Sequence, residues 1–137
     1  MWVDERGSDV LGPAECHQLL AIGARRHLPG HLGIPDLDAP TVLPVDYLVD
    51  GHDVLIRVGE SLFARVEGKL VAFEVEAPDD DRPWSVLVKG LALPEAFEAV
   101  PGKVPVPRAA RPGHRLVRIR SDAVTGRRLG QRPAVPW

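Results

Sequence analysis

The sequence contains a single cysteine, Cys16, among its 137 residues, and it contains no asparagine. One cysteine excludes an internal disulfide framework and a zinc site built from several cysteines. No apolar run approaches the ~18 residues that a membrane-spanning helix requires. The first residues carry charges of both signs and include no apolar segment typical of a secretory signal. We therefore expect a cytoplasmic protein that does not contact a membrane.

Aromatic residues are also scarce, with three Phe, three Trp and one Tyr, whereas the 14 prolines and 13 glycines indicate many turns. Valine is frequent in the apolar runs, and β-branched side chains favour strands. The formal net charge of −2 and the isoelectric point of about 6.2 argue against a broad nucleic-acid-binding surface. A chain of this length is typical of one domain, which we assign to residues 1–137.

An amphipathic helix is predicted over residues 13–25. Pro13 suits the first turn of a helix, and Glu15 lies near the positive end of the helix dipole. One face is apolar at three- and four-residue spacing. That face comprises Cys16, Leu19, Leu20 and Gly23. We therefore interpret Cys16 as a buried structural thiol rather than a nucleophile.

Strands are predicted where apolar and β-branched residues form runs between turn signals. These runs are residues 41–49, 54–58, 70–76, 84–93 and 114–120. Asp50-Gly51 predicts a hairpin between the first two runs, and Gly90 predicts a bulge in the fourth. Residues 60–67 predict a short helix, and residues 95–98 predict a helical turn. Five or six strands with these helices favour a mainly β fold, a small antiparallel barrel without free sheet edges.

The sequence offers little for nucleophilic or metal chemistry. It has four serines and no Gly-x-Ser-x-Gly pattern, so a serine hydrolase is unsupported. His27 and His31 have helical spacing, but Pro29-Gly30 interrupts any helix between them. The acidic run at residues 79–81 lacks the glycine and distal glutamate of a calcium-binding loop and is interpreted as a solvated loop. We therefore predict no metal site.

The segment Arg57-Val58-Gly59-Glu60-Ser61 lies where a predicted strand meets a predicted helix. Backbone N–H groups and the positive dipole end at such a junction bind phosphate, and Arg57, Ser61 and Arg65 add charge and a hydroxyl. No P-loop and no Gly-x-Gly-x-x-Gly motif is present. The spacing alone supports two interpretations of this segment, a phosphate-binding site and a set of ordinary surface arginines.

Several segments also occur in an order that is shared with a known family. They are Leu43-Pro44-Val45-Asp46-Tyr47 with Val49-Asp50-Gly51, Ile56-Arg57-Val58, Val71-Ala72-Phe73-Glu74-Val75, Trp84-Ser85-Val86-Leu87-Val88-Lys89-Gly90, and Val117-Arg118-Ile119 with Val124-Thr125-Gly126-Arg127-Arg128-Leu129. The series resembles the pyridoxamine 5′-phosphate oxidase-like family, in particular its small actinobacterial flavin-nucleotide-binding members. The resemblance covers residues 13–129.

The resemblance implies a split β-barrel of the FMN-binding type, with an N-terminal helix and a short mid-chain helix. It implies a homodimer with flavin mononucleotide (FMN) in a groove between the subunits, and a flavin-dependent oxidoreductase. In this arrangement the strand at 54–58 contacts the ring, the turn after it binds the phosphate, and the strand at 84–93 borders the site. The cofactor-binding residues implied are Arg57, Val58, Ser61, Arg65, Trp84 and Ser85.

One departure from the family pattern concerns the phosphate. Relatives carry Ser-Lys-Leu after this strand, whereas this chain has Ser61-Leu62-Phe63, so Leu62 replaces a cation. Losing one phosphate cation costs on the order of 1.5–3 kcal/mol, or roughly ten- to a hundredfold in affinity. Two alternatives follow. One is a degenerate split barrel with a structural or ligand-binding role and no redox activity. The other is a protein that binds the deazaflavin F420, whose longer anionic tail would meet Arg127 and Arg128.

Overall fold

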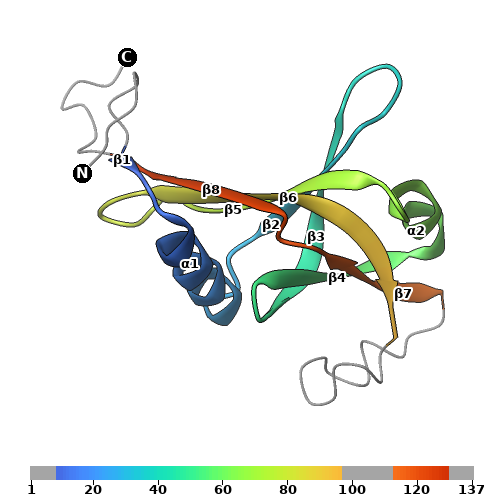
Figure 1. The fold of residues 1–137 in the computed structure, drawn as a ribbon, viewed down its shortest axis with the longest axis horizontal. Helices are drawn as coiled ribbons and strands as arrows, with labels where there is room; N and C mark the ends of the chain where they lie inside the picture. The colour runs from blue at the N-terminus through green and yellow to red at the C-terminus, as the bar shows by residue number, and fades with distance from the viewer. Residues whose placement is uncertain (1–8, 97–112, 130–137) are drawn as a thin grey trace.

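The computed structural model describes residues 9–96 and 113–129. Both predicted helices and all five predicted strands are present. Glu95 belongs to a strand where a helical turn was predicted, and residues 97 and 98 of that turn lie outside the described residues. The elements in chain order are β1 (Asp9–Val10), α1 (Pro13–Arg25), β2 (Gly30–Ile34), β3 (Thr41–Asp50), β4 (Asp53–Gly59), α2 (Glu60–Val66), β5 (Leu70–Ala77), β6 (Trp84–Glu95), β7 (His114–Ile119) and β8 (Ala123–Arg128) (Figure 1).

Six of the strands close into an antiparallel barrel. β2 pairs with β3, β3 with β4, β4 with β7, β7 with β6, β6 with β5, and β5 returns to β2. β8 pairs with the first half of β6, and β1 pairs with β8. Closure of the ring removes the free edges that an open sheet would present. The predicted mainly β barrel is confirmed.

β3 changes partners half-way along its length. Residues 41–45 pair with β2, and residues 46–50 pair with β4. Pro44 lies in the first half, opposite His31 of β2, where β4 is not yet paired with the strand. Proline has no N–H group to donate, so a position with a neighbour on one side only accommodates it.

Three strands, β1, β2 and β8, form outside the five predicted runs. β1 has only two residues, and β8 is largely polar, so neither sequence carries an apolar signal. Pairing with β6 along six register positions holds β8 in the strand conformation. The described residues therefore form eight strands rather than five or six.

Gly90 does not form a bulge, contrary to the prediction. The β5–β6 register runs without interruption through the pair of Val71 and Gly90. A Cβ atom at Gly90 would lie 1.6 Å from the carbonyl oxygen of Arg120. The glycine is therefore required because the chain after β7 passes directly against the backbone of β6.

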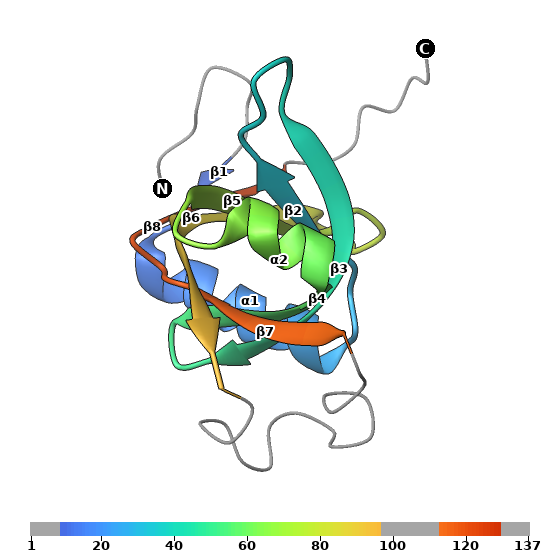
Figure 2. The same cartoon turned by 90° about the vertical axis from the view of Figure 1, so that its right-hand side faces the viewer.

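The two helices lie at opposite ends of the barrel, and α2 crosses the end that faces the viewer in Figure 2. α1 packs on β8, β3 and β5, while α2 packs on β4 and β7. α2 buries Phe63 and Val66. The predicted apolar face of α1 is buried, namely Cys16, Leu19, Leu20 and Gly23. The fully buried side chains of the main core include Phe73, Leu20, Leu32, Ile34 and Ile56.

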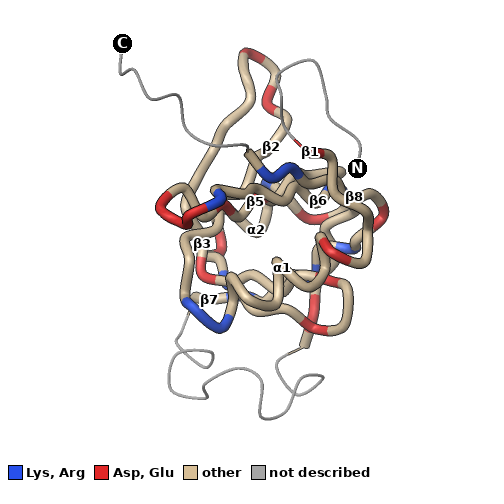
Figure 3. Tube along the Cα trace, turned by 90° about the vertical axis from the view of Figure 1, so that its left-hand side faces the viewer, with Lys and Arg blue, Asp and Glu red and all other residues tan. Residues whose placement is uncertain are grey.

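Acidic and basic positions are interspersed along the described chain rather than gathered on one face (Figure 3). Across residues 9–96 and 113–129, neither helix has the length and apolar character needed to cross a bilayer.

Candidate ligand-binding site

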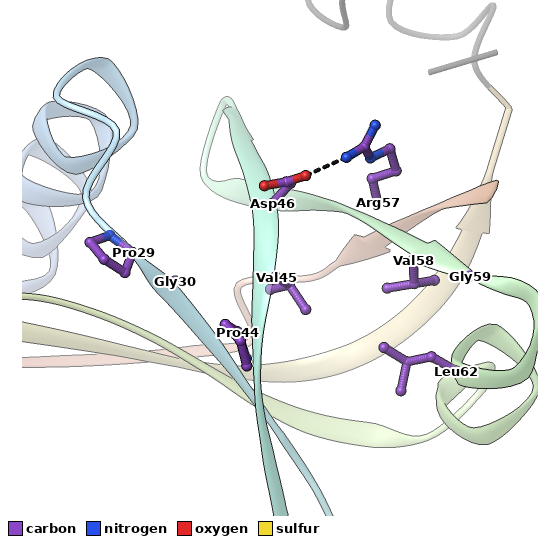
Figure 4. Close-up of a pocket in the computed structure, with 9 residues that line it drawn as sticks. All are labelled: Pro29, Gly30, Pro44, Val45, Asp46, Arg57, Val58, Gly59 and Leu62. Atoms are coloured by element: carbon purple, nitrogen blue, oxygen red, sulfur yellow. Dashed lines mark hydrogen bonds and ion pairs between the residues drawn. The ribbon is translucent and has the colours of Figure 1, made fainter. Parts of the chain in front are cut away.

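A groove of about 440 Å³ lies where the bend of β3 meets the end of β4 and the start of α2 (Figure 4). This volume is within the range of small-molecule sites. The start of β2 completes one side. The described residues that line the groove are Pro29, Gly30, Pro44, Val45, Asp46, Arg57, Val58, Gly59 and Leu62.

Most of the side chains that line the groove are apolar. Pro44 and Val45 come from β3, and Val58 and Leu62 come from β4 and α2 (Figure 4). Val58 is buried in the main core, and Leu62 packs partly exposed against that core. Because the core fixes these two side chains from behind, the wall keeps its shape without a ligand.

Gly59 ends β4 and is also the N-cap of α2. The first N–H groups of a helix have no intrahelical acceptor. No side chain caps this end of α2 in their place. A Cβ atom at Gly59 would meet nothing within 4 Å, so open space lies against the backbone at this edge of the groove. Glu60 places a carboxylate in the first turn, where the helix dipole favours negative charge.

Arg115 of β7 lies directly opposite Val58 in the β4–β7 register. Its guanidinium carbon is 3.9 Å from the centroid of the Phe63 ring. Its Nη1 atom lies 3.5 Å from Oε2 of Glu60. Arg115 is therefore held beside the groove wall by a cation–π contact and an ion pair, but it is not among the lining residues.

Arg57 and Asp46 form an ion pair at the polar edge of the groove. They lie directly opposite each other in the β3–β4 register, and a guanidinium N–H of Arg57 donates to the Asp46 carboxylate (Figure 4). The side chain of Arg57 is 14% exposed and that of Asp46 is 63% exposed. Among the described lining residues they are the one cation and the one carboxylate, so the lining carries no net formal charge.

The structure places four of the predicted cofactor-binding residues in two locations. Arg57 and Val58 line the groove. Ser61 is exposed on α2 and is not a lining residue. Arg65, one turn further along α2, donates to Asp36 in the β2–β3 connection at 2.8 Å. Arg65 therefore ties α2 to the β2–β3 hairpin rather than facing the groove.

Trp84 and Ser85 begin β6 and lie outside the groove lining. Trp84 is 3% exposed, and its indole N–H donates to Asp80 at 3.1 Å. Arg26, at the C-terminal end of α1, pairs with the same carboxylate at 2.9 Å. The bond from Arg26, followed by the bond from Trp84, holds the pKa of Asp80 below its usual range. This cluster joins the loop before β6 to the end of α1.

The lining residues from β2 and β3 were not predicted. Asp46 had a sequence signal: a two-residue turn after Asp50 fixes the hairpin register, and that register puts Asp46 opposite Arg57. Pro29 and Gly30 reach the groove through the β2–β3 pairing, which no local pattern in the sequence indicates.

The described residues offer no site for a metal ion, because no three His, Cys, Asp or Glu side chains among them are suitably grouped. Cys16 is fully buried. Its burial, and then the nearby charge of Glu15, raise the pKa of the thiol. A buried thiol with a raised pKa is unreactive, which agrees with the structural role predicted for Cys16.

Residues 13–128 match the pyridoxamine 5′-phosphate oxidase family. The match runs from the first residue of α1 to the last residue of β8, and it therefore includes the whole barrel. The chain belongs to this family. The groove of this pyridoxamine 5′-phosphate oxidase family member lies entirely within the matched residues.

Solved structures of similar proteins share the fold of this family member. The FAD binding protein from Mycobacterium smegmatis has a TM-score of 0.69 and 24% identity, with 90% of this chain and 99% of that chain covered. A conserved protein from Corynebacterium diphtheriae has a TM-score of 0.70 and 24% identity, with 90% and 98% covered. The FAD-binding protein from Mesorhizobium loti has a TM-score of 0.68 and 18% identity, with 90% and 98% covered. No curated protein matches the sequence.

Proposed function

We propose that this family member binds a flavin nucleotide, FMN, in the groove between β3, β4 and α2. The observation that carries the proposal is the position of Arg57, a cation in a groove whose other lining residues, except Asp46, have apolar side chains or are glycine. Such a groove suits a ligand with an uncharged flat ring and an anionic phosphate, because each part meets a wall of matching chemistry. Two of the similar structures are of proteins named as FAD-binding, which also supports a flavin.

The residues of the groove fit the ring better than the phosphate. Val45, Val58 and Leu62 exclude water from one face of a flat ring, and the extended backbone of β4 runs alongside it. Arg57 holds the anionic end and so fixes the orientation of the ligand. When bound, the flavin supplies hydride or electron transfer. The protein is on this proposal a flavin-dependent oxidoreductase whose own residues bind, orient and shield the cofactor.

We also propose that the protein acts as a homodimer. Val42 is 64% exposed and Leu70 is 67% exposed on the outer face of the barrel. Val42 lies opposite Gly33, which lies opposite Ala72, so a row of small or apolar residues crosses β3, β2 and β5. Pro44 follows Val42 by two residues and shares its face of β3, and it lines the groove. A second copy seated on this face would therefore bury apolar surface and cover the groove.

Leu62 favours a second candidate function. Its side chain lines the groove in the first turn of α2, where the family pattern predicts a cation. The groove therefore offers an incoming phosphate one lining cation among the described residues. A barrel that binds a less anionic ligand, without redox activity, fits this lining.

The test is a binding titration of the purified full-length protein. Its visible absorbance is recorded first, and FMN, riboflavin and F420 are then titrated separately. We expect FMN to bind more tightly than riboflavin, because only FMN carries the phosphate that Arg57 contacts. Reduction of the bound FMN by a nicotinamide donor tests the redox role, and light scattering tests the dimer.

Three outcomes of this titration separate the candidates. Failure of FMN and riboflavin to bind overturns the flavin proposal. Preference for riboflavin over FMN, without reduction of either flavin by the nicotinamide donor, supports the second candidate. Preference for F420 over FMN identifies the deazaflavin as the ligand.

A further inference from the structure

The ion pair between Asp46 and Arg57 lies at the edge of the groove. The Arg57 side chain is 14% exposed, so little of it is open to solvent. The Asp46 side chain is 63% exposed and extends toward the guanidinium from the neighbouring strand (Figure 4). The carboxylate thus lies at the solvent side of the cation, which an anionic ligand must reach.

A carboxylate and a phosphate use the same donors of an arginine. Both accept N–H bonds from the guanidinium through oxygens that share a negative charge. The described lining residues include no second cation, so an incoming phosphate must displace Asp46 or share Arg57 with it. Sharing brings two anions close together, which costs electrostatic energy. Glu60 adds a further carboxylate next to Gly59, where it pairs with Arg115 rather than with Arg57.

We propose that Asp46 is a specificity-determining residue that competes with the anionic group of the ligand for Arg57. The competition lowers the affinity of the groove for a phosphate-bearing ligand relative to an uncharged ligand with the same ring. The identity of that ligand as a flavin rests on the proposed function. The competition itself does not, because it applies equally to inorganic phosphate.

The test compares the full-length protein with its Asp46→Asn variant, which keeps the size of the side chain and removes the charge. Dissociation constants are measured for FMN, for riboflavin, which has the same ring without a phosphate, and for inorganic phosphate. We expect Asp46→Asn to bind FMN and inorganic phosphate roughly two- to fivefold more tightly. This change in affinity corresponds to the free energy that an exposed ion pair contributes. We expect its affinity for riboflavin to be unchanged.

Glu15→Gln is the matched control variant. Glu15 is also an exposed carboxylate, at 48%, and it pairs with a less exposed arginine, Arg128, at 22%. It lies on α1 and does not line the groove. Its substitution changes the net charge of the protein by the same amount, so any general effect of charge on phosphate binding appears in both variants.

A double-mutant cycle assigns the effect to Arg57. In an Arg57→Ala background, Asp46→Asn is expected to leave the affinities for FMN and phosphate unchanged, because the contested cation is gone. Equal or weaker binding of phosphate by Asp46→Asn in the parent protein overturns the inference and shows that Asp46 instead holds Arg57 in position. Absence of phosphate binding by both proteins also overturns it. If phosphate binds as expected but neither flavin does, the proposed function fails while the competition stands.

Discussion

The imidazole rings of His17 and His52 stack face to face, with centroids 3.9 Å apart and planes inclined by 6°. His17 belongs to α1, and His52 lies in the turn between β3 and β4. This contact joins the helix at one end of the barrel to the hairpin whose register places Asp46 opposite Arg57. Burial of His17, and then the charge of His52, lower the pKa of His17, and Asp53 offsets part of that shift.

The first prediction concerns stability at mildly acidic pH. Because the folded pKa of His17 is lowered, the unfolded chain binds a proton more readily than the folded chain. The free energy of unfolding should therefore fall as the pH decreases from about 6.5, the value of an unperturbed histidine, toward the lowered pKa. Urea unfolding of the parent and of His17→Gln between pH 7.5 and 5 (about the range of histidine titration) measures the slope of the free energy of unfolding against pH.

The slope should be shallower in His17→Gln than in the parent. His27→Gln is the control, because His27 is an exposed histidine just after α1. An identical slope in all three proteins would show that the stacked pair does not contribute to the pH dependence.

The second prediction concerns ligand affinity. Arg57→Ala removes the lining cation, so FMN should bind roughly ten- to a hundredfold more weakly, which corresponds to about 1.5–3 kcal/mol for a charge-assisted bond. Riboflavin should bind with little change, because it has no phosphate. Arg120→Ala is the control, since Arg120 is an exposed arginine that pairs with Asp122 and does not line the groove. FMN affinity equal to that of the parent would remove Arg57 from the binding site.

The third prediction tests the close approach at Gly90. Gly90→Ala would place a Cβ atom 1.6 Å from the backbone oxygen of Arg120, and a backbone atom cannot rotate away as a side chain does. We expect a loss of about 1–3 kcal/mol or more in the free energy of unfolding. Gly33→Ala is the matched control in β2, because its Cβ would lie at an ordinary 3.5 Å from the Cβ of Ala72. It should change stability by less than about 0.5–1 kcal/mol. Equal effects would contradict the packing at Gly90.

The fourth prediction concerns a buried hydroxyl. The hydroxyl of Tyr47 is buried without a hydrogen-bond partner among the described residues, and burial raises its pKa to about 12. Its ring packs on Phe73 with centroids 4.9 Å apart. Tyr47→Phe keeps the ring and removes the unsatisfied group, so the free energy of unfolding should stay equal or rise by up to about 1 kcal/mol.

The comparison for Tyr47 is a variant that removes the ring. Tyr47→Ala should cost about 3 kcal/mol, because it leaves a cavity beside Phe73. Guanidinium unfolding measures both variants. A loss of more than about 1 kcal/mol in Tyr47→Phe would mean that the hydroxyl makes a bond that stabilises the fold.

Features that depend on neighbouring residues were predictable from the sequence. α1 begins at Pro13 and ends at Arg25 as predicted, because a proline in the first turn and an apolar face at helical spacing are both local signals. The Asp50-Gly51 hairpin was predicted for a similar reason, and Gly51 adopts a φ of +62°, which favours glycine. The proximity of Arg57 to a strand–helix junction is likewise local.

Features that depend on pairing between distant segments were not predictable in the same way. Arg65 was assigned to the site by its spacing after the strand–helix junction and Trp84 by resemblance, yet Arg65 pairs with Asp36 and Trp84 with Asp80. Their positions depend on where the β2–β3 hairpin and the loop before β6 lie once the barrel has closed. A residue's spacing along the chain contains no information about that closure.

By itself, the sequence determined the helices, most of the strands, the hairpin turn and a cation at the end of β4, because each follows from the periodicity and turn preferences of a few consecutive residues. The tertiary structure alone decided that the bend of β3 and the start of β2 complete the groove, and that Arg57 and Asp46 line it whereas Arg65 and Trp84 do not. The physical reason is that closing a six-stranded ring fixes which outward-facing side chains meet, and that closure joins strands far apart in the chain.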